Sequence, residues 1–134
     1  MKKVTSFFMV ILALAFSAGS LYAGPTPTDL RGTIANYVKT QEKNHGAFMV
    51  IDERTKEPRR LELVRVHERV GKAGNYYYSC TDMKDVKTGD LLDLDFDIDA
   101  HDGRLDVAGI RIHKDNGKPR YTYDDKDNLI PLPA

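Results

Sequence analysis

Residues 92 to 100 alternate strictly between apolar and acidic side chains, and they constrain the fold more than any other part of the chain. The apolar positions are Leu92, Leu94, Phe96, Ile98 and Ala100, and the acidic positions are Asp93, Asp95, Asp97 and Asp99. Successive side chains of a β-strand point to opposite faces, whereas an α-helix would spread both sets around its axis. The pattern therefore predicts a strand whose apolar face lies on the core and whose carboxylates all face water.

Two glycine-containing turns flank this strand and suggest its pairing register. The turn His101-Asp102-Gly103 predicts a three-residue hairpin loop with Gly103 in the left-handed conformation. That loop would set Asp99, Asp97, Asp95 and Asp93 opposite Leu105, Val107, Gly109 and Arg111, in that order. The turn Lys87-Thr88-Gly89 would set Tyr76, Tyr78 and Cys80 on the core side, and Tyr77, Ser79 and Thr81 beside the aspartates.

The rest of the chain reads as one helix followed by strands. Apolar residues at helical spacing predict a helix over residues 29–44, capped by Thr28 or Asp29 and ended by Gly46. β-prone runs predict strands over residues 48–52, 61–70, 76–83, 91–100 and 105–113, with a short edge strand at 121–123. The proline-containing tail from Leu129 cannot join a central strand, because proline lacks a backbone donor.

This order predicts an α+β fold, with one N-terminal helix packed on a four- or five-stranded antiparallel meander sheet. In topology alone, such an order resembles the cystatin-like architecture, in which a curved sheet wraps one helix. A small OB-like β-barrel is the alternative, because residues 76–98 also read as two strands of such a barrel.

The first 23 residues have the composition of a secretory signal peptide. Lys2 and Lys3 precede an apolar run from Phe7 to Phe16, and small residues lead to Ala23. We therefore expect cleavage after residue 23, a flexible leader over 24–28 and a single domain over 29–134. The short basic start indicates a periplasmic protein, with secretion from the cell as the alternative. Cys80 is the only cysteine, so the domain has no internal disulfide.

The charge balance argues against a nucleic-acid partner, because 20 basic and 20 acidic residues leave no basic excess. The predicted water-facing side of the sheet is instead a mixed polar surface that would bind an extracytoplasmic protein or a polar polymer. The residues expected to form this surface are Arg65, His67, Arg69, Tyr77, Asp95, Asp97, Asp99 and Arg111.

The same aspartates also suggest a divalent-cation site of the calcium type. Calcium binds several oxygen ligands from one locality, and Asp93, Asp95 and Asp97 would supply them, with His113 as a neighbour. The spacing differs from that of an EF-hand loop, which needs a glycine and a final glutamate.

No catalytic signature accompanies these residues. Cys80 with His67 or His113 would suggest a thiol nucleophile, but the expected register buries Cys80 in the core, away from both histidines. The sequence therefore favours a small exported, non-enzymatic binding or interaction domain, such as an inhibitor or accessory protein. The alternative function is divalent-cation binding through the row from Asp93 to Asp99.

Overall fold

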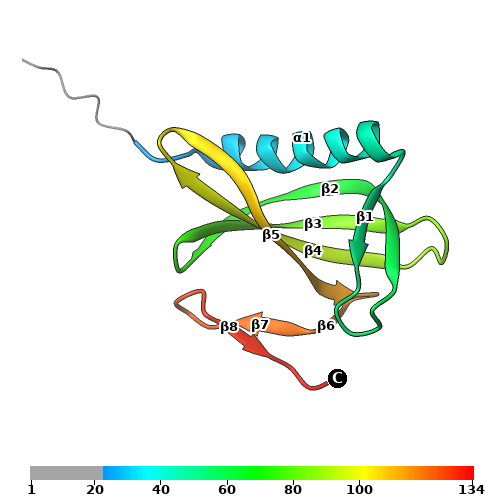
Figure 1. Cartoon of the computed structure of the whole chain (residues 1–134). Coiled ribbons are helices and arrows are strands. Elements are labelled where there is room, and N and C mark those ends of the chain that lie inside the picture. Colours follow the sequence, from blue (N-terminus) through cyan, green and yellow to red (C-terminus); the bar gives the residue numbers. More distant parts are fainter. Residues whose placement is uncertain (1–22) are drawn as a thin grey trace, which may run out of the picture.

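The computed structural model describes residues 23–134. The predicted signal peptide lies outside the described residues except for its last position, Ala23. Among the described residues, no helix is long and apolar enough to cross a membrane. Helix α1 (Pro27–His45) runs along one side of an antiparallel sheet, and a small C-terminal hairpin lies on the other side (Figure 1).

The large sheet is a meander in the order β1-β2-β3-β4-β5-β6. Its strands are β1 (Phe48–Ile51), β2 (Pro58–Ala73), β3 (Tyr76–Asp85), β4 (Leu91–His101), β5 (Arg104–Asp115) and β6 (Lys118–Pro119). The predicted α+β arrangement is confirmed, with six strands instead of four or five. The OB-like alternative is wrong, because β1 and β6 are the two edges of an open sheet.

The helix begins earlier than its periodicity predicted. Thr26 is the N-cap: its Oγ1 accepts a hydrogen bond from the Asp29 amide at 3.1 Å, and Asp29 Oδ2 accepts one from the Thr26 amide at 2.9 Å. Pro27 occupies the first turn, where its missing N–H costs nothing. The predicted cap at Thr28 or Asp29 is therefore wrong, whereas the predicted end at Gly46, with φ of 74°, is confirmed.

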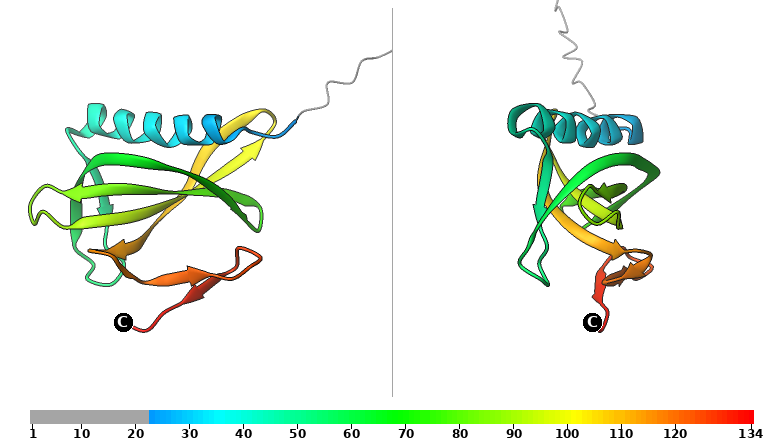
Figure 2. Two further views of the ribbon diagram at one scale, coloured as in Figure 1. Left: turned by 180° about the vertical axis from the view of Figure 1, so that it is seen from behind. Right: turned by 90° about the vertical axis from the view of Figure 1, so that its right-hand side faces the viewer.

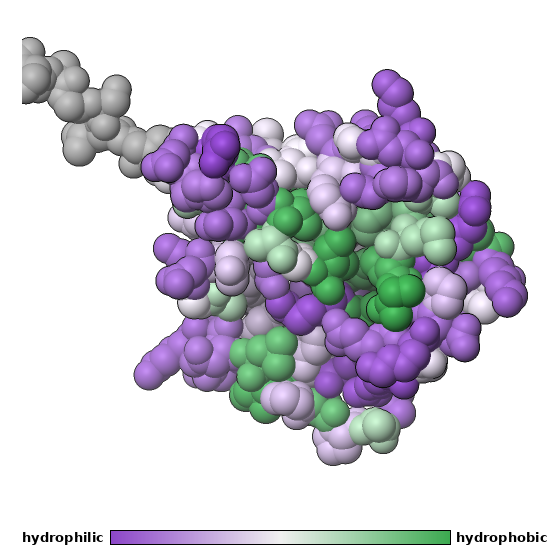
Figure 3. Space-filling model, in the orientation of Figure 1, coloured by the Kyte–Doolittle hydropathy of each residue, from purple (hydrophilic) through white to green (hydrophobic). Residues whose placement is uncertain are grey.

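The core lies between the helix and the apolar face of the sheet. Leu30, Ile34 and Val38 of α1 pack on the even-numbered residues of β4, which are Leu92, Leu94, Phe96 and Ile98. The alternation along β4 is thus confirmed on its apolar side. Figure 3 shows hydrophobic surface over β1 and β5, where Val50, Val107 and Ile110 form the half-buried margin of this core.

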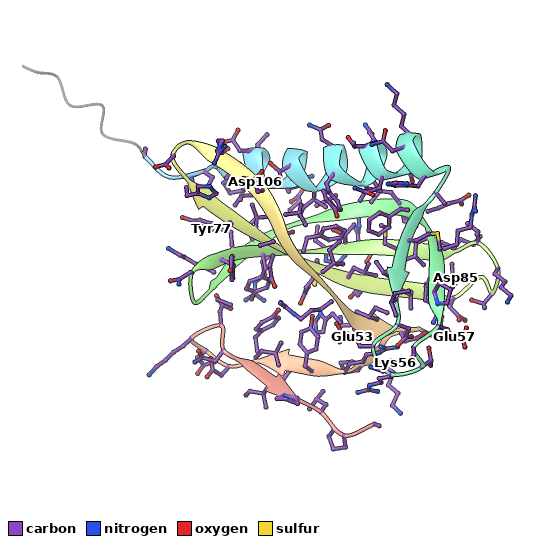
Figure 4. The ribbon with its side chains drawn as sticks, viewed as in Figure 1. Glu53, Lys56, Glu57, Tyr77, Asp85 and Asp106 are labelled. Atoms are coloured by element: carbon purple, nitrogen blue, oxygen red, sulfur yellow. The ribbon has the colours of Figure 1, made fainter. Side chains whose placement is uncertain are left out.

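The pairing of β3 with β4 is shifted by one residue from the predicted register. Cys80 pairs with Asp95 and Ser79 with Phe96, so Tyr77, Ser79 and Thr81 share the core side. A one-residue shift sends every side chain to the opposite face. Tyr78 and Cys80, predicted in the core, therefore lie on the face of the sheet that carries Asp93, Asp95, Asp97 and Asp99, which we call the aspartate face. Tyr77 packs against the core beside α1 (Figure 4).

The β4–β5 hairpin also has a shorter loop than predicted. His101 pairs with Arg104, so the loop is Asp102-Gly103, with φ of 49° and 73° at these residues. Two left-handed residues are typical of a type I′ turn. Two register shifts farther along the hairpin then place Asp95 opposite Arg111 and Asp93 opposite Lys114.

The aspartate face is covered by the C-terminal residues. β7 (Tyr121–Tyr123) pairs with β8 (Leu129–Pro131) in a separate two-stranded sheet. This hairpin lies below the large sheet in Figure 1 and in both views of Figure 2, on the side away from α1. The predicted strand at 121–123 is confirmed, but it covers a face of the sheet instead of extending its edge. The expectation that all four carboxylates face water is therefore wrong for Asp95 and Asp97, which are buried.

Candidate functional site

Two β-bulges determine where the two histidines of the aspartate face, His67 and His113, lie. Between Val66 and Val70, β2 has more residues than the facing part of β3, and His67 belongs to this bulge. On β5, Ile112 pairs with Leu94 and Lys114 with Asp93, which leaves His113 as the extra residue of a second bulge. Bulges redirect side chains and are frequent beside functional sites. Here they bring a histidine from each side towards the middle of the sheet.

Cys80 on β3 and His113 on β5 meet across β4. The Cys80 Sγ atom lies 3.4 Å from His113 Nδ1, and the thiol donates a hydrogen bond to Asp95 Oδ1. His113 Nε2 lies 3.1 Å from the carbonyl oxygen of Tyr121, and the His113 ring stacks on the Tyr121 ring at 4.6 Å. Because a carbonyl only accepts, Nε2 carries the proton of the neutral ring, and Nδ1 presents its lone pair towards Cys80.

Asp93 lies within reach of this pair and of a second histidine. One ligand atom each from Cys80, Asp93 and His113 lies within 4.8 Å of the others, and the same holds for His67, Asp82 and Asp93. His67 Nε2 is 2.7 Å from Asp82 Oδ1 and 4.0 Å from Asp93 Oδ1. Asp93 thus belongs to two groups of metal-ligating side chains.

The two facing carboxylates Asp82 and Asp93 respond differently to their surroundings. Burial, followed by the neighbouring Asp82, raises the pKa of Asp93. Burial also opposes ionisation of Asp82, but hydrogen bonds with Asp93, His67 and Arg65 outweigh it and lower the pKa of Asp82 to about 2. At neutral pH Asp82 is thus the more firmly ionised member of the pair.

Asp95 is fully buried and receives hydrogen bonds from the C-terminal hairpin. The hydroxyls of Tyr121 and Tyr123 each donate to Asp95 Oδ2 at 2.7 Å. Burial first, and then the Asp95 charge, raise the pKa of both hydroxyls and of the Cys80 thiol. All three groups therefore remain protonated at neutral pH and act as donors to the buried carboxylate.

Asp97 is committed to an arginine. Arg111 binds both carboxylate oxygens of Asp97 through its two terminal nitrogens, and Nη2 also donates to the Tyr123 hydroxyl at 3.1 Å. Such a bidentate pair uses the lone pairs that a cation would need. Through Arg111, Asp97 therefore helps to hold the C-terminal hairpin over the sheet, and it is not available as a metal ligand.

A cavity of about 200 Å³ opens beside these groups. Its lining residues are His67, Arg69, Tyr78, Cys80, Asp93, His113, Lys114 and Tyr123. Tyr78 and Tyr123 stack at 4.5 Å and form an aromatic wall. The ligating side chains thus border a space that holds a small ligand or several waters.

The predicted metal ligands are therefore only partly brought together. Asp93 and His113 meet, whereas Asp95 is satisfied by hydroxyls and Asp97 by Arg111. Sequence reasoning missed Cys80 and Asp82 because it placed β3 one residue out of register. Met83 carried the signal that was missed. Residues two apart in a strand share a face, so this apolar residue predicts that Ser79 and Thr81 lie on the core side with it, and Met83 is fully buried.

The predicted interaction surface is also rearranged. Arg65, Arg69 and Asp99 keep exposed side chains, His67 is half-buried, and Arg111, Asp95 and Asp97 are held under the hairpin. Tyr77 lies on the core side. The eight residues do not form one continuous surface, and an interaction function stays a prediction without this surface to support it.

A second acidic cluster lies near the β1–β2 turn. Arg120 binds both oxygens of buried Asp52 at 2.8 Å. Arg59 lies 2.5 Å from Asp85, 2.9 Å from Asp90 and 3.6 Å from Asp115. Figure 4 shows Asp85 beside this turn, which carries Glu53, Lys56 and Glu57. The arginines neutralise the carboxylates of this cluster. The cluster links the β1–β2 turn to β2, to β3 and to the C-terminal residues.

No family model matches this chain, and no curated protein or solved structure matches it significantly.

Proposed function

We propose that this protein binds a divalent cation of the zinc class at Cys80, Asp93 and His113. The observation that carries the proposal is the convergence of a thiol, an imidazole and a carboxylate within 4.8 Å on the wall of a cavity. Sulfur and nitrogen ligands favour zinc and its d-block neighbours, whereas calcium and magnesium bind oxygen. The calcium-type ligand set expected from the sequence is thus replaced by a softer one.

The distance between Cys80 and His113 fits a shared ion. Tetrahedral zinc, with bonds of about 2.3 Å to sulfur and about 2.0 Å to nitrogen, separates the two atoms by about 3.6 Å. The separation of Cys80 Sγ from His113 Nδ1 is 3.4 Å. The Cys80 and His113 side chains therefore need little movement to share an ion.

The surroundings of His113 support the same conclusion. A histidine that ligates a metal usually donates its other ring proton to a carbonyl or carboxylate, which fixes the tautomer and the ring orientation. The Tyr121 carbonyl takes this role at Nε2, and stacking on the Tyr121 ring holds the imidazole plane.

Metal binding would exchange two existing contacts. The thiol proton now bonded to Asp95 would pass to solvent as the Cys80 thiolate takes the ion. The ammonium of Lys114 lies 3.3 Å from Asp93 Oδ2, and its side chain is 40% exposed, so it can move into water as the carboxylate turns to the ion. Cavity water would complete the coordination.

Isothermal titration with Zn²⁺, Ca²⁺ and Mg²⁺ tests the proposal. Of the three ions, we expect only Zn²⁺ to bind saturably, and the affinity of the site at Cys80 to fall by at least about 100-fold in both Cys80→Ser and His113→Gln. His101→Gln is the matched control, because His101 lies 3.2 Å from Asp99 in an exposed pair away from the cavity. Absence of Zn²⁺ binding, or equal binding by wild type and both site variants, would overturn the proposal.

A further inference from the structure

A second group of ligands adjoins the proposed zinc site and shares one of its residues. His67, Asp82 and Asp93 satisfy the same mutual distance of 4.8 Å as Cys80, Asp93 and His113. The two histidines come from opposite sides, on β2 and β5, with Asp93 on β4 between them. Resting on the function proposed above, we propose that Asp93 bridges two metal ions, the second held by His67 and Asp82.

The two oxygens of Asp93 are suited to separate ions. Oδ1 is the oxygen 4.0 Å from His67 Nε2, whereas Oδ2 is 3.3 Å from the Lys114 ammonium. A carboxylate that offers each oxygen to a different cation can hold two ions about 3.5–4 Å apart, as in many two-metal hydrolytic sites. The cavity gives the second ion access from solvent, since His67 and Asp93 both line it.

The pairing of Asp82 with Asp93 supports a cation between them. These residues are direct cross-strand partners on β3 and β4, where like charges are normally destabilising. The present counter-charges are exposed: Arg65 reaches Asp82 Oδ2 at 2.9 Å, and its side chain is 68% exposed. Exposed ion pairs of this kind contribute about 0–1 kcal/mol, so an ion with two carboxylate ligands can displace them.

The remaining oxygens point the right way for this exchange. Arg65 binds Asp82 Oδ2, the Lys114 ammonium lies 3.3 Å from Asp93 Oδ2, and Asp82 Oδ1 faces His67 Nε2 at 2.7 Å. The second ion would take the place of the proton in that histidine–carboxylate contact. Its ligand set of one nitrogen and two carboxylates is harder than the first, so we expect Mn²⁺ or Zn²⁺ there and a clear preference for Zn²⁺ at Cys80.

Metal stoichiometry tests the bridge. After dialysis against excess Zn²⁺, elemental analysis should find two ions per chain in wild type and one in His67→Gln and in Cys80→Ser. Asp93→Asn should lose both ions or hold them at least tenfold more weakly. Arg65→Gln is the informative control, because removing a competitor for Asp82 should tighten the second ion several-fold.

Each remaining outcome has a distinct meaning. One ion per chain, lost in Cys80→Ser and unaffected in His67→Gln, would overturn the second site and leave the proposed function standing. Two ions that both persist in Asp93→Asn would overturn the bridge. No bound ion would overturn the proposed function itself. Far-UV circular dichroism and urea unfolding of every variant show that each loss arises in a folded protein.

Discussion

Two acidic clusters of this protein differ in what neutralises them. Around Asp52, the counter-charges are Arg59 and Arg120, whose side chains are 13% and 10% exposed. Around Asp93, the counter-charges are Arg65 and Lys114, which are 68% and 40% exposed, and the neighbouring half-buried side chains are a thiol and two histidines. Carboxylate density therefore does not by itself distinguish a structural cluster from a ligand site.

The difference lies in whether the lone pairs are already used. Asp52 accepts from three arginine nitrogens and from the amides of Arg54 and Thr55, so a cation would have to displace rigid, buried partners. Asp93 has one exposed ammonium as its cationic partner and borders a cavity. The first arrangement stabilises the fold, and the second leaves ligands accessible.

The largest expected effect comes from removing the carboxylate of the arginine cluster. Asp52→Ala leaves Arg120 buried without its bidentate partner, and breaking a buried pair in this way costs about 3 to 5 kcal/mol. Urea unfolding at pH 7 measures the change in the free energy of unfolding. A loss below about 1 kcal/mol would show that the arginine cluster is not structural and would remove the contrast with Asp93.

The second-largest expected effect is the loss of stability that acid causes through the same cluster. Hydrogen bonds from Arg120 hold the pKa of Asp52 well below its usual range. A carboxyl whose folded-state pKa is lowered stabilises the fold fully above its unfolded pKa of about 4, and this contribution is lost as pH falls through the lower folded value. Wild type should therefore lose stability below about pH 4 more steeply than Asp52→Asn. Parallel acid-unfolding curves would contradict the assignment.

Zinc should stabilise the protein through the other cluster. A ligand that binds only the folded state adds about 2.7 kcal/mol at a free concentration 100 times Kd. We expect the Tm of wild type to rise with Zn²⁺ and that of Cys80→Ser to rise clearly less, because this variant keeps only the second ion. A similar rise in both would place the ion elsewhere.

Removing a tyrosine hydroxyl that covers Asp95 should lower the free energy of unfolding by an intermediate amount. Tyr121→Phe removes one of two hydroxyl donors from the buried Asp95 carboxylate, and a hydrogen bond to a charged group contributes about 2 kcal/mol. The loss should appear in urea unfolding without added metal. An unchanged free energy of unfolding would mean that the C-terminal hairpin does not stabilise the aspartate face.

The smallest effect is expected at the end of the aspartate row. Asp99 has a side chain that is 43% exposed and contacts only the exposed His101 among the ion pairs of the described residues. Asp99→Ala should change the free energy of unfolding by less than about 0.5 kcal/mol and leave zinc affinity unchanged. A larger change in either would show that the whole row acts as a unit.

The sequence predicts the elements of this fold better than their register. The helix and the alternating strand follow from periodicity, which is a local property. The β3 register depends on the exact loop length between Asp85 and Asp90, whose backbone groups close the turn. The run of Tyr76, Tyr77 and Tyr78 has no polar–apolar contrast that would correct a one-residue error.

The candidate site was harder to predict because it depends on contacts between distant segments. The bulges at His67 and His113 have no local sequence signal such as a glycine. The cover over Asp95 comes from Tyr121 and Tyr123, 26 and 28 residues farther along the chain. A strand pattern shows which residues share a face, but not what later packs on that face.

The most direct test of the proposed zinc site is anomalous X-ray diffraction from crystals grown with Zn²⁺, recorded at the zinc absorption edge. We expect an anomalous peak about 2.3 Å from Cys80 Sγ and about 2.0 Å from His113 Nδ1. Density confined to exposed carboxylates such as Asp99, with none at Cys80, would contradict the assignment.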